Sequence, residues 1–278
     1  MRLLDDRMPA TNPEAEAAAV YDRRARLLSE QNRLPPVASL TYGPHPKQRI
    51  ELYRPTGLRG GGALPVLVFL HGGAWIAGGM EWLRFMAEAA TQQPAILAAV
   101  SYRLAPQDKW PAQLDDAAAA VRLVQAEVHR HGGDPERMVV AGHSAGGHLA
   151  AMTVLACHID PVRACMPVSG PMDLRYDRIP SDIGKGRVYR YLFQTPEDDE
   201  GASPICAIEG NTTPFHFVWG ENDFDRIADS CFRMDAAMRN AGQVVESHVI
   251  PEAGHFDTHL VLNNTRNDWY RAFRSFVG

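Results

Sequence analysis

The most constraining feature of this sequence is a short apolar run that ends in a serine-containing turn and continues into small residues. The segment reads Val139-Val140-Ala141-Gly142-His143-Ser144-Ala145-Gly146-Gly147-His148-Leu149-Ala150. In a strand–turn–helix of this kind, the serine is held in a strained conformation at the tip of the strand. Strand and helix then approach so closely that side chains at positions 142 and 146 would collide, and both residues are glycine. The pattern predicts a nucleophile elbow at Ser144 rather than an ordinary serine in a glycine-rich turn.

The helix predicted after this turn runs from Ala145 to about Cys157. Its free N–H groups and the positive end of its dipole point at any negative charge that develops beside Ser144. The N–H of Ala145 is therefore a candidate donor to an oxyanion.

A second glycine-rich segment follows the apolar run 65–70, which predicts a central strand buried on both faces. It reads His71-Gly72-Gly73-Ala74-Trp75. Backbone N–H donors aimed at an oxyanion contribute about 3 kcal/mol each, and glycine lets the backbone approach the reacting group. We therefore predict Gly72 and Gly73 as oxyanion donors opposite Ala145, and we expect His71 to order the loop through hydrogen bonds. The alternative is a glycine-rich loop without a catalytic role.

Apolar runs of strand length alternate with helical patterns along most of the chain. Besides the run before Ser144, strands are predicted at 39–42, 49–53, 65–70, 95–102, 162–168, 214–220 and 244–250. Helices are predicted within 1–35 and at 81–91, 110–130, 145–157, 227–241 and 264–276. This alternation is typical of an α/β fold with a mostly parallel, doubly wound sheet and right-handed crossovers. A chain of 278 residues is near the upper limit for one core, so we expect one domain over residues 1–278.

Two segments stand outside this alternation. Residues 1–36 form a predicted N-terminal helical segment, which either packs over the mouth of a pocket or extends the core. From about 170 to 213 the periodicity lapses into Gly, Pro and scattered aromatic residues, with an acidic run at 197–200. Insertions of this length are commonly functional lids, so we predict a partly helical lid there and a solvated loop at the acidic run.

The composition argues against several classes of partner. With 22% charged residues, 45% apolar residues and a formal charge of −5, the chain has the composition of a soluble globular protein and no basic surplus for nucleic acid. No apolar run reaches the length of a membrane span, and the N-terminus carries Asp5 and Asp6 in place of a secretory signal. The four cysteines lack metal-ligand spacing. We expect a cytoplasmic protein with no cofactor, no metal, and no nucleic-acid or membrane partner. The sequence leaves open whether the protein is a monomer or a homodimer.

Candidates for a catalytic acid follow a predicted strand downstream of Ser144. Asp223 lies three residues beyond Gly220, which ends the predicted strand 214–220. A catalytic acid of this chain order is expected just after a strand, and Asp223 stands there. Asp223 is the preferred acid, with Asp225 and Glu221 as alternatives.

The preferred base is His255, which stands in the loop after the last predicted strand. His259, about one helical turn later, and His248, inside that strand, are weaker candidates. The chain order of Ser144, then Asp223, then His255 is that of the α/β-hydrolase triad.

These segments resemble one superfamily across nearly the whole chain. The HGG-containing esterases of the α/β-hydrolase superfamily carry motifs similar to His-Gly-Gly at 71–73, Tyr-Arg-Leu-Ala-Pro at 102–106, Gly-His-Ser-Ala-Gly-Gly at 142–147, Gly-Glu-Asn-Asp at 220–223 and Gly-His-Phe at 254–256. The resemblance implies the α/β-hydrolase fold and a triad of Ser144, Asp223 and His255.

Two branches of that superfamily resemble different segments of this chain. The segment 102–106 resembles the hormone-sensitive-lipase branch, which usually has Asp where this chain has His143 and a larger N-terminal cap. His-Ser-Ala-Gly-Gly-His-Leu-Ala and His-Gly-Gly-x-Trp are more similar to the kynurenine formamidase-like esterases, which often carry Tyr at the position of Ala74.

The leading functional hypothesis is a serine hydrolase that cleaves a small carboxylic ester or aryl formamide with a short acyl group through an acyl-enzyme. A medium-chain lipase-like esterase and a non-catalytic binding module on the same fold are the alternatives.

We expect substrate contacts from Trp75 and His143. Trp82, Phe85 and the aromatic residues of 172–193 are candidates for an apolar wall or lid above Ser144. The alternative is that Trp75 and Phe85 fill the core beneath the loop.

Overall fold

The structure, a computed structural model, describes residues 13–57, 62–179 and 182–278. The predicted N-terminal segment 1–36 is therefore seen from residue 13 onward, and its first 12 residues lie outside the described part.

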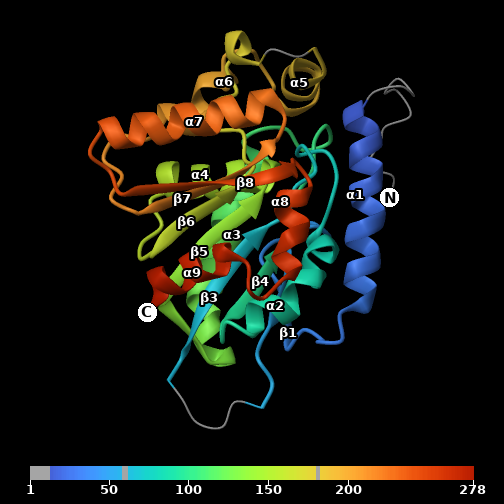
Figure 1. The fold of residues 1–278 in the computed structure, drawn as a ribbon, viewed down its shortest axis with the longest axis vertical. Helices are drawn as coiled ribbons and strands as arrows, with labels where there is room; N and C mark the ends of the chain where they lie inside the picture. The colour runs from blue at the N-terminus through green and yellow to red at the C-terminus, as the bar shows by residue number, and fades with distance from the viewer. Residues whose placement is uncertain (1–12, 58–61, 180–181) are drawn as a thin grey trace.

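A single mixed sheet of eight strands organises the described residues, in the order β1-β2-β4-β3-β5-β6-β7-β8 (Figure 1). The first two strands pair antiparallel and β2 pairs antiparallel with β4, whereas every other pairing is parallel. The strands are β1 Ala38–Thr41, β2 Arg49–Tyr53, β3 Leu64–Leu70, β4 Ile96–Val100, β5 Gly133–His143, β6 Ala164–Val168, β7 Phe215–Asn222 and β8 Val245–Gly254. The predicted α/β class with a mostly parallel sheet is confirmed.

Helices cover both faces of this sheet. They are α1 Pro13–Gln31, α2 Ala87–Thr91, α3 Ala112–Glu127, α4 Ala145–Ala156, α5 Asp182–Lys185, α6 Asp198–Gly201, α7 Asp225–Asn240, α8 Asp257–Leu260 and α9 Asp268–Val277. Shorter 3₁₀ segments are η1 Met80–Met86, η2 Val128–His131, η3 Tyr176–Arg178, η5 Pro204–Cys206 and η6 Val261–Asn263, and η4 Gly186–Leu192 is a π-helix.

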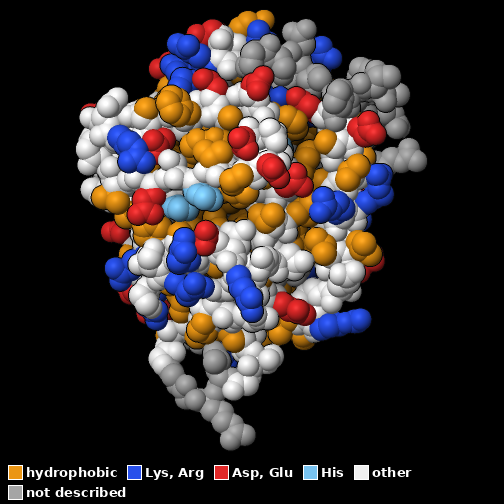
Figure 2. Space-filling view, viewed as in Figure 1, with side chains coloured by type: hydrophobic (Ala, Val, Ile, Leu, Met, Phe, Trp, Pro, Cys, Tyr) orange, Lys and Arg blue, Asp and Glu red, His pale blue; other side chains and the backbone are white. Residues whose placement is uncertain are grey.

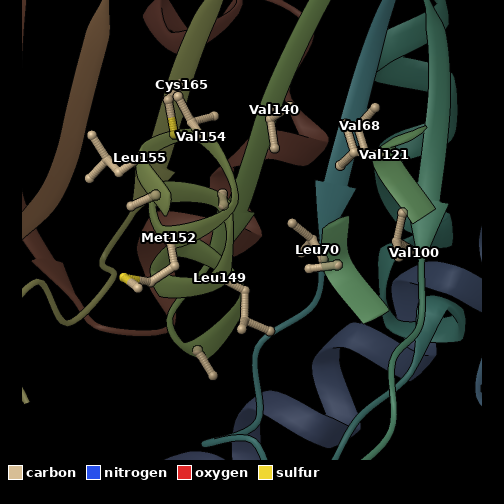
Figure 3. Close-up of a cluster of buried hydrophobic side chains, with 14 of the residues drawn as sticks. Val68, Leu70, Val100, Val121, Val140, Leu149, Met152, Val154, Leu155 and Cys165 are labelled. Atoms are coloured by element: carbon tan, nitrogen blue, oxygen red, sulfur yellow. The ribbon is translucent and has the colours of Figure 1, made fainter. Parts of the chain in front are cut away.

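The central strands are apolar on both faces because each face packs against its own helices. Alternate residues of β3 point to opposite sides, so Val68 and Leu70 join one apolar cluster while Leu67 and Phe69 join another. The first cluster packs against α3, α4 and α7, and Figure 3 shows Val68, Leu70, Val100 and Val140 of the sheet with Leu149 and Met152 of α4. The second packs against α1, α2 and α9.

Several element boundaries differ from the sequence prediction, and three of them have a clear structural description. The helix predicted at 81–91 begins as the 3₁₀ segment η1 and becomes α-helical only at Ala87. The last helix begins at Asp268 rather than near Asn264, because the side chain of Asn267 caps it by accepting the N–H of Trp269. The strand predicted to end at Gly220 continues to Asn222, with an irregularity in its pairing to β8.

The two segments outside the strand–helix alternation contact each other through an ion pair between Glu14 and Arg187. Helix α1 runs along one flank of the sheet and packs against η1 (Figure 1). Residues 170–213 form short helical pieces, and α5 and α6 lie near α7 at one end of the molecule. The acidic run, predicted as a solvated loop, is instead largely the short helix α6.

The surface carries interspersed charges of both signs on the face drawn in Figure 2. None of the helices in the described ranges is both long and apolar enough to cross a bilayer. The four cysteines are free thiols; Cys165 and Cys231 are buried, Cys157 is half-buried and Cys206 is exposed.

Candidate active site

The elbow around Ser144 has the close approach that its glycines predict. Ser144 connects β5 to α4 with φ 55° and ψ −121°, in the left-handed region that non-glycine residues rarely adopt. A Cβ on Gly146 would lie 2.1 Å from the Leu70 carbonyl oxygen, and one on Gly142 would lie 2.4 Å from the Gly146 backbone. The N–H of Ser144 donates to the carbonyl of Val168 on β6 at 2.8 Å, which fixes the turn to the neighbouring strand.

Three side chains from different elements meet at this turn. His255 Nε2 lies 2.9 Å from Ser144 Oγ, and His255 Nδ1 lies 2.7 Å from Asp223 Oδ1. Asp223 and His255 are buried, whereas Ser144 is partly exposed. Ser144 follows β5, Asp223 follows β7 and His255 follows β8, so the parallel strands deliver all three at their carboxyl ends.

The alternative acids and bases lie elsewhere. Asp225 and Glu221 are exposed, and Glu221 accepts the backbone N–H of Glu252. His248 is exposed on β8. His259 is buried in α8 and lies 2.8 Å from the hydroxyl of Tyr21, so it does not reach Ser144 by any hydrogen bond in the described residues.

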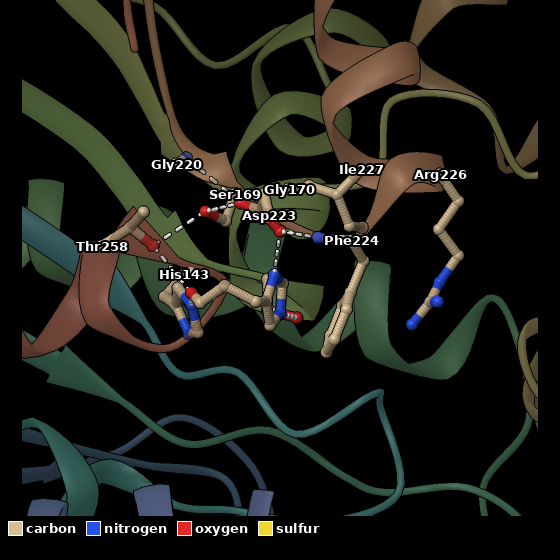
Figure 4. Close-up of polar contacts among 12 residues, drawn as sticks. His143, Ser169, Gly170, Gly220, Asp223, Phe224, Arg226, Ile227 and Thr258 are labelled. Carbon is tan, nitrogen blue, oxygen red and sulfur yellow. Dashed lines mark hydrogen bonds and ion pairs between the residues drawn. The ribbon is translucent and has the colours of Figure 1, made fainter. Parts of the chain in front are cut away.

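Asp223 is held by more groups than the sequence analysis identified. The hydroxyl of Ser169 donates to its Oδ2 at 2.6 Å, and the N–H of Phe224 donates to its Oδ1 at 2.8 Å (Figure 4). Thr258 Oγ1 lies 2.8 Å from the Ser169 hydroxyl and donates to the His255 carbonyl at 2.8 Å. Ser169 directly follows β6, which lies between β5, the strand before Ser144, and β7, the strand before Asp223. Its place at the end of that strand is the sequence signal that could have identified it as a partner of Asp223.

These contacts decide the ionisation of the acid. Burial alone would raise the pKa of Asp223, but His255, the Ser169 hydroxyl and the N–H of Gly220 stabilise the carboxylate and bring the pKa below its usual value. The group facing His255 is therefore an acceptor-only carboxylate, which keeps the imidazole proton on Nδ1 and leaves Nε2 as the acceptor toward Ser144.

The backbone N–H groups predicted as oxyanion donors lie in the loop after β3 and at the first residue of α4. Across the ranges that the structure describes, the N–H groups of Gly72, Gly73 and Ala145 donate to no acceptor in the chain. Gly73 has φ 119°, and a Cβ there would lie 2.2 Å from the carbonyl oxygen of Ala77. The glycine is required both by conformation and by space.

His71 orders this loop, as expected. Its Nδ1 lies 2.6 Å from the Gly72 carbonyl oxygen, and its own carbonyl accepts the Tyr102 hydroxyl at 2.8 Å. The rings of His71 and Tyr102 stack at 4.2 Å. This explains why a tyrosine after β4 accompanies the glycine-rich loop.

Ser144 opens into a pocket of about 1050 Å³, counted with the solvent at its mouth. Trp75, Trp82 and His143 line it, as predicted. The prediction for Phe85 and the aromatic residues of 172–193 is wrong, since none of them belongs to the described lining. Tyr21, Phe224 and Phe256 supply the other aromatic walls.

The aromatic residues that were wrongly predicted to line the pocket pack against other side chains. Phe85 packs on His259 at 4.9 Å, and Tyr189 stacks edge-on against Tyr176 and Phe193 within the 170–213 segment. That segment contributes aliphatic and charged residues to the pocket instead, among them Leu174, Ile179 and Val188.

Comparison with protein families agrees with this geometry. A family model described as "alpha/beta hydrolase fold" matches residues 67–258. The chain belongs to this family. The match begins within β3 and ends in α8, so it contains the elbow, the glycine-rich loop, Asp223 and His255.

Known relatives of this α/β hydrolase include named esterases. Esterase LipC of Mycobacterium tuberculosis is 29% identical over 238 residues, which are 77% of this chain and 58% of that protein. Isoprenylcysteine alpha-carbonyl methylesterase of Arabidopsis thaliana is 36% identical over 246 residues, 80% of this chain and 57% of that protein. The chain thus spans a little over half the length of each relative. A solved Pyrobaculum calidifontis esterase shares the fold, with a TM-score of 0.79, 23% identity and coverage of 99% and 95% of the two chains.

His143, which precedes Ser144, contacts the backbone of His255. It is buried, and its Nε2 lies 2.9 Å from the carbonyl oxygen of His255. Its ring stacks on His259 at 4.8 Å. It is also one of the residues that line the pocket beside Ser144.

Buried histidines should make the stability of this α/β hydrolase fall in mild acid. Burial lowers the pKa of His71 and His143 to about 3 and that of His148 to about 4. The unfolded chain takes up protons on these groups below about pH 6.5, whereas the folded chain does not. We expect the free energy of unfolding to be highest above pH 6.5 and to fall as the pH drops toward 4, by about 2 kcal/mol per histidine at pH 5.

Urea denaturation at pH 7.5, 6 and 5 measures this dependence. His148→Asn should reduce the slope between pH 6 and 5 by about one proton per molecule, whereas replacing the exposed His248 with Asn should leave the slope unchanged. Equal stability at pH 7.5 and 5 would contradict the prediction.

Proposed function

We propose that this chain is a serine hydrolase that cleaves small carboxylic esters through an acyl-enzyme. The observation that carries the proposal is the unbroken chain of contacts from Asp223 through His255 to Ser144, at 2.7 and 2.9 Å, beside backbone N–H groups that have no acceptor in the described structure. A non-catalytic binding module has no need for a strained serine aligned with a base and a carboxylate.

In the first half-reaction, Ser144 Oγ attacks the carbonyl carbon while His255 Nε2 takes the hydroxyl proton. The carbonyl oxygen becomes an oxyanion, which the N–H groups of Gly72, Gly73 and Ala145 stabilise. His255 then gives the proton to the departing alcohol oxygen as the C–O bond breaks, leaving acyl-Ser144. Asp223 orients the imidazole and stabilises its cation throughout.

In the second half-reaction, water attacks the acyl carbon and His255 takes its proton. Collapse of this second oxyanion breaks the bond to Ser144 Oγ, which recovers its proton from His255, and the carboxylic acid leaves.

The names of the relatives support an ester as the substrate, because esterases of two organisms match most of this chain. The same attack cleaves an aryl formamide, in which an aniline nitrogen takes the place of the alcohol oxygen. We propose the formyl group as an acceptable acyl group on size alone.

The acyl group is proposed to be short. Trp75 follows the glycine-rich loop directly, and it is buried with its indole in the pocket wall. Trp82 lines the same pocket, and its ring would lie 3.3 Å from a Cβ on Gly73. Because these indoles lie so close to the oxyanion donors, they leave space only for small acyl groups such as formyl and acetyl. The leaving group then lies against Tyr21, Phe224 and Phe256.

We expect kcat/KM to fall monotonically along p-nitrophenyl acetate, butyrate and decanoate, by roughly tenfold or more between the ends. Formanilide and N-formylkynurenine in the same assay test the formamide reaction. Trp75→Ala should reduce the difference between acetate and butyrate by removing the indole. A preference for decanoate would overturn the short-acyl pocket and favour a lipase-like groove, whereas no turnover of any ester would overturn the hydrolase itself.

A further inference from the structure

The two halves of the oxyanion hole belong to elements that are far apart in the chain. Gly72 and Gly73 lie in the loop after β3, and Ala145 is the first residue of α4. Oxyanion donors act only when each stands about 3 Å from one oxygen, so the separation of these two elements matters for catalysis.

One buried side-chain hydrogen bond joins the loop to the helix. The indole Nε1–H of Trp75 donates to His148 Nδ1 at 3.3 Å, and the two rings meet edge to face at 5.1 Å. Among the described residues, no other hydrogen bond that involves a side chain links residues 71–79 to α4. Trp75 is two residues after Gly73, and His148 is about one helical turn after Ser144.

The second nitrogen of His148 reaches the 170–213 segment. His148 Nε2 lies 2.7 Å from the carbonyl oxygen of Ala202, just after α6. A carbonyl only accepts, so Nε2 carries the proton and Nδ1 is the acceptor for Trp75. His148 is fully buried, and both of its nitrogens are used.

The loop that His148 contacts has an unusual backbone conformation. Gly73, Ala74 and Trp75 have φ values of 119°, 51° and 61°, so three consecutive residues lie at positive φ. A strained segment keeps such a conformation only where its surroundings enforce it. The Trp75 carbonyl is bound by the N–H of Ala105, and the Trp75 side chain is bound by His148.

We propose that His148 is a positioning residue that sets the oxyanion loop against the helix carrying Ser144 and Ala145, by accepting the indole N–H of Trp75. This inference rests on the proposed hydrolase function. His148 does not line the pocket, so it acts through Trp75 and the loop rather than on the substrate.

Two substitutions separate the two hydrogen bonds of His148. In His148→Asn, Oδ1 stands near the place of Nδ1 and can still accept from Trp75, whereas the bond to Ala202 is lost. In His148→Gln, Nε2 reaches the Ala202 carbonyl, whereas the acceptor for Trp75 is lost. Each variant gives up one buried hydrogen bond, so similar shifts in melting temperature are expected.

The activities of the two variants should differ. His148→Gln is expected to lower kcat for p-nitrophenyl acetate by roughly 10- to 100-fold with little change in KM, because a displacement of about 1 Å near the reacting atoms has effects of that size. His148→Asn is expected to stay within about threefold of the wild type. In a Trp75→Phe background, which has no indole N–H, the Asn and Gln variants should become equal in kcat.

Thr153→Val is the matched control, since Thr153 is equally buried on α4 and its hydroxyl has no partner in the described structure. It should not change kcat. Equal losses in His148→Asn and His148→Gln, or losses that follow the melting temperature in every variant, would assign His148 a purely structural role and overturn the proposal.

Amide hydrogen exchange of residues 71–79 gives a readout that does not need turnover. We expect faster exchange there in His148→Gln than in wild type, and wild-type exchange in His148→Asn. If the wild type hydrolyses no ester but this exchange pattern holds, the proposed function fails while the structural coupling stands. Unchanged exchange in both variants, in an active enzyme, would overturn the coupling.

Discussion

Ser144→Ala is expected to lower kcat for p-nitrophenyl acetate by about 10⁶, which is the loss seen when a triad of this kind is deprived of its nucleophile. The hydroxyl is the atom that His255 Nε2 contacts at 2.9 Å, and no other described hydroxyl makes that contact. Alanine fits the position without collision, because serine already occupies the left-handed conformation there. The measurement is a steady-state assay together with labelling by a fluorophosphonate probe.

The control for this prediction is Ser275→Ala, which removes an exposed hydroxyl on α9. Wild type and Ser275→Ala should be labelled and active, while Ser144→Ala should be folded by circular dichroism and unlabelled. Retention of more than a few per cent of the activity in Ser144→Ala would remove the nucleophile assignment.

Asp223→Asn is expected to lower kcat by about 10⁴ with the fold intact. The carboxylate accepts from His255 Nδ1 at 2.7 Å, and an amide in its place favours the tautomer that carries its proton on Nε2. That imidazole has no lone pair for the proton of Ser144. The substitution also removes the negative charge that stabilises the imidazolium in the transition state.

Asp225→Asn is the matched control two residues away. Asp225 is exposed at the start of α7 and makes no hydrogen bond to His255, so kcat should change less than about twofold. Both variants are assayed over a range of pH, because a tautomer effect persists at a pH where the imidazole is neutral. A larger loss in Asp225→Asn than in Asp223→Asn would overturn the assignment of the acid.

The fold was predictable where the sequence pattern is local. Continuous apolar runs identified β3 and β4, because parallel strands covered on both faces have no polar side. Boundaries set by single side chains were less predictable, as at Asn267, which moves the start of α9. Such a cap depends on one hydrogen bond and leaves no periodic signal.

The residues that meet at the site were also predictable, because they stand at the ends of strands. Ser144, Asp223 and His255 follow β5, β7 and β8, and a parallel sheet gathers the carboxyl ends of its strands at one edge. The aromatic wall was only half predictable. Trp75 belongs to the glycine-rich loop itself, whereas Tyr21 reaches the pocket from α1, more than 100 residues before the nucleophile.

By itself, the sequence determined the strand–turn–helix at Ser144, the alternation of strands and helices, and the order in which a serine, an acid and a base appear. Each of these depends on residues close together in the chain or on one periodicity. Only the tertiary structure decided that Ser169 supports Asp223, that His143 holds His255, and that His148 joins Trp75 to Ala202. Those contacts join distant segments through one hydrogen bond each, so their partners are set by how the sheet and helices pack.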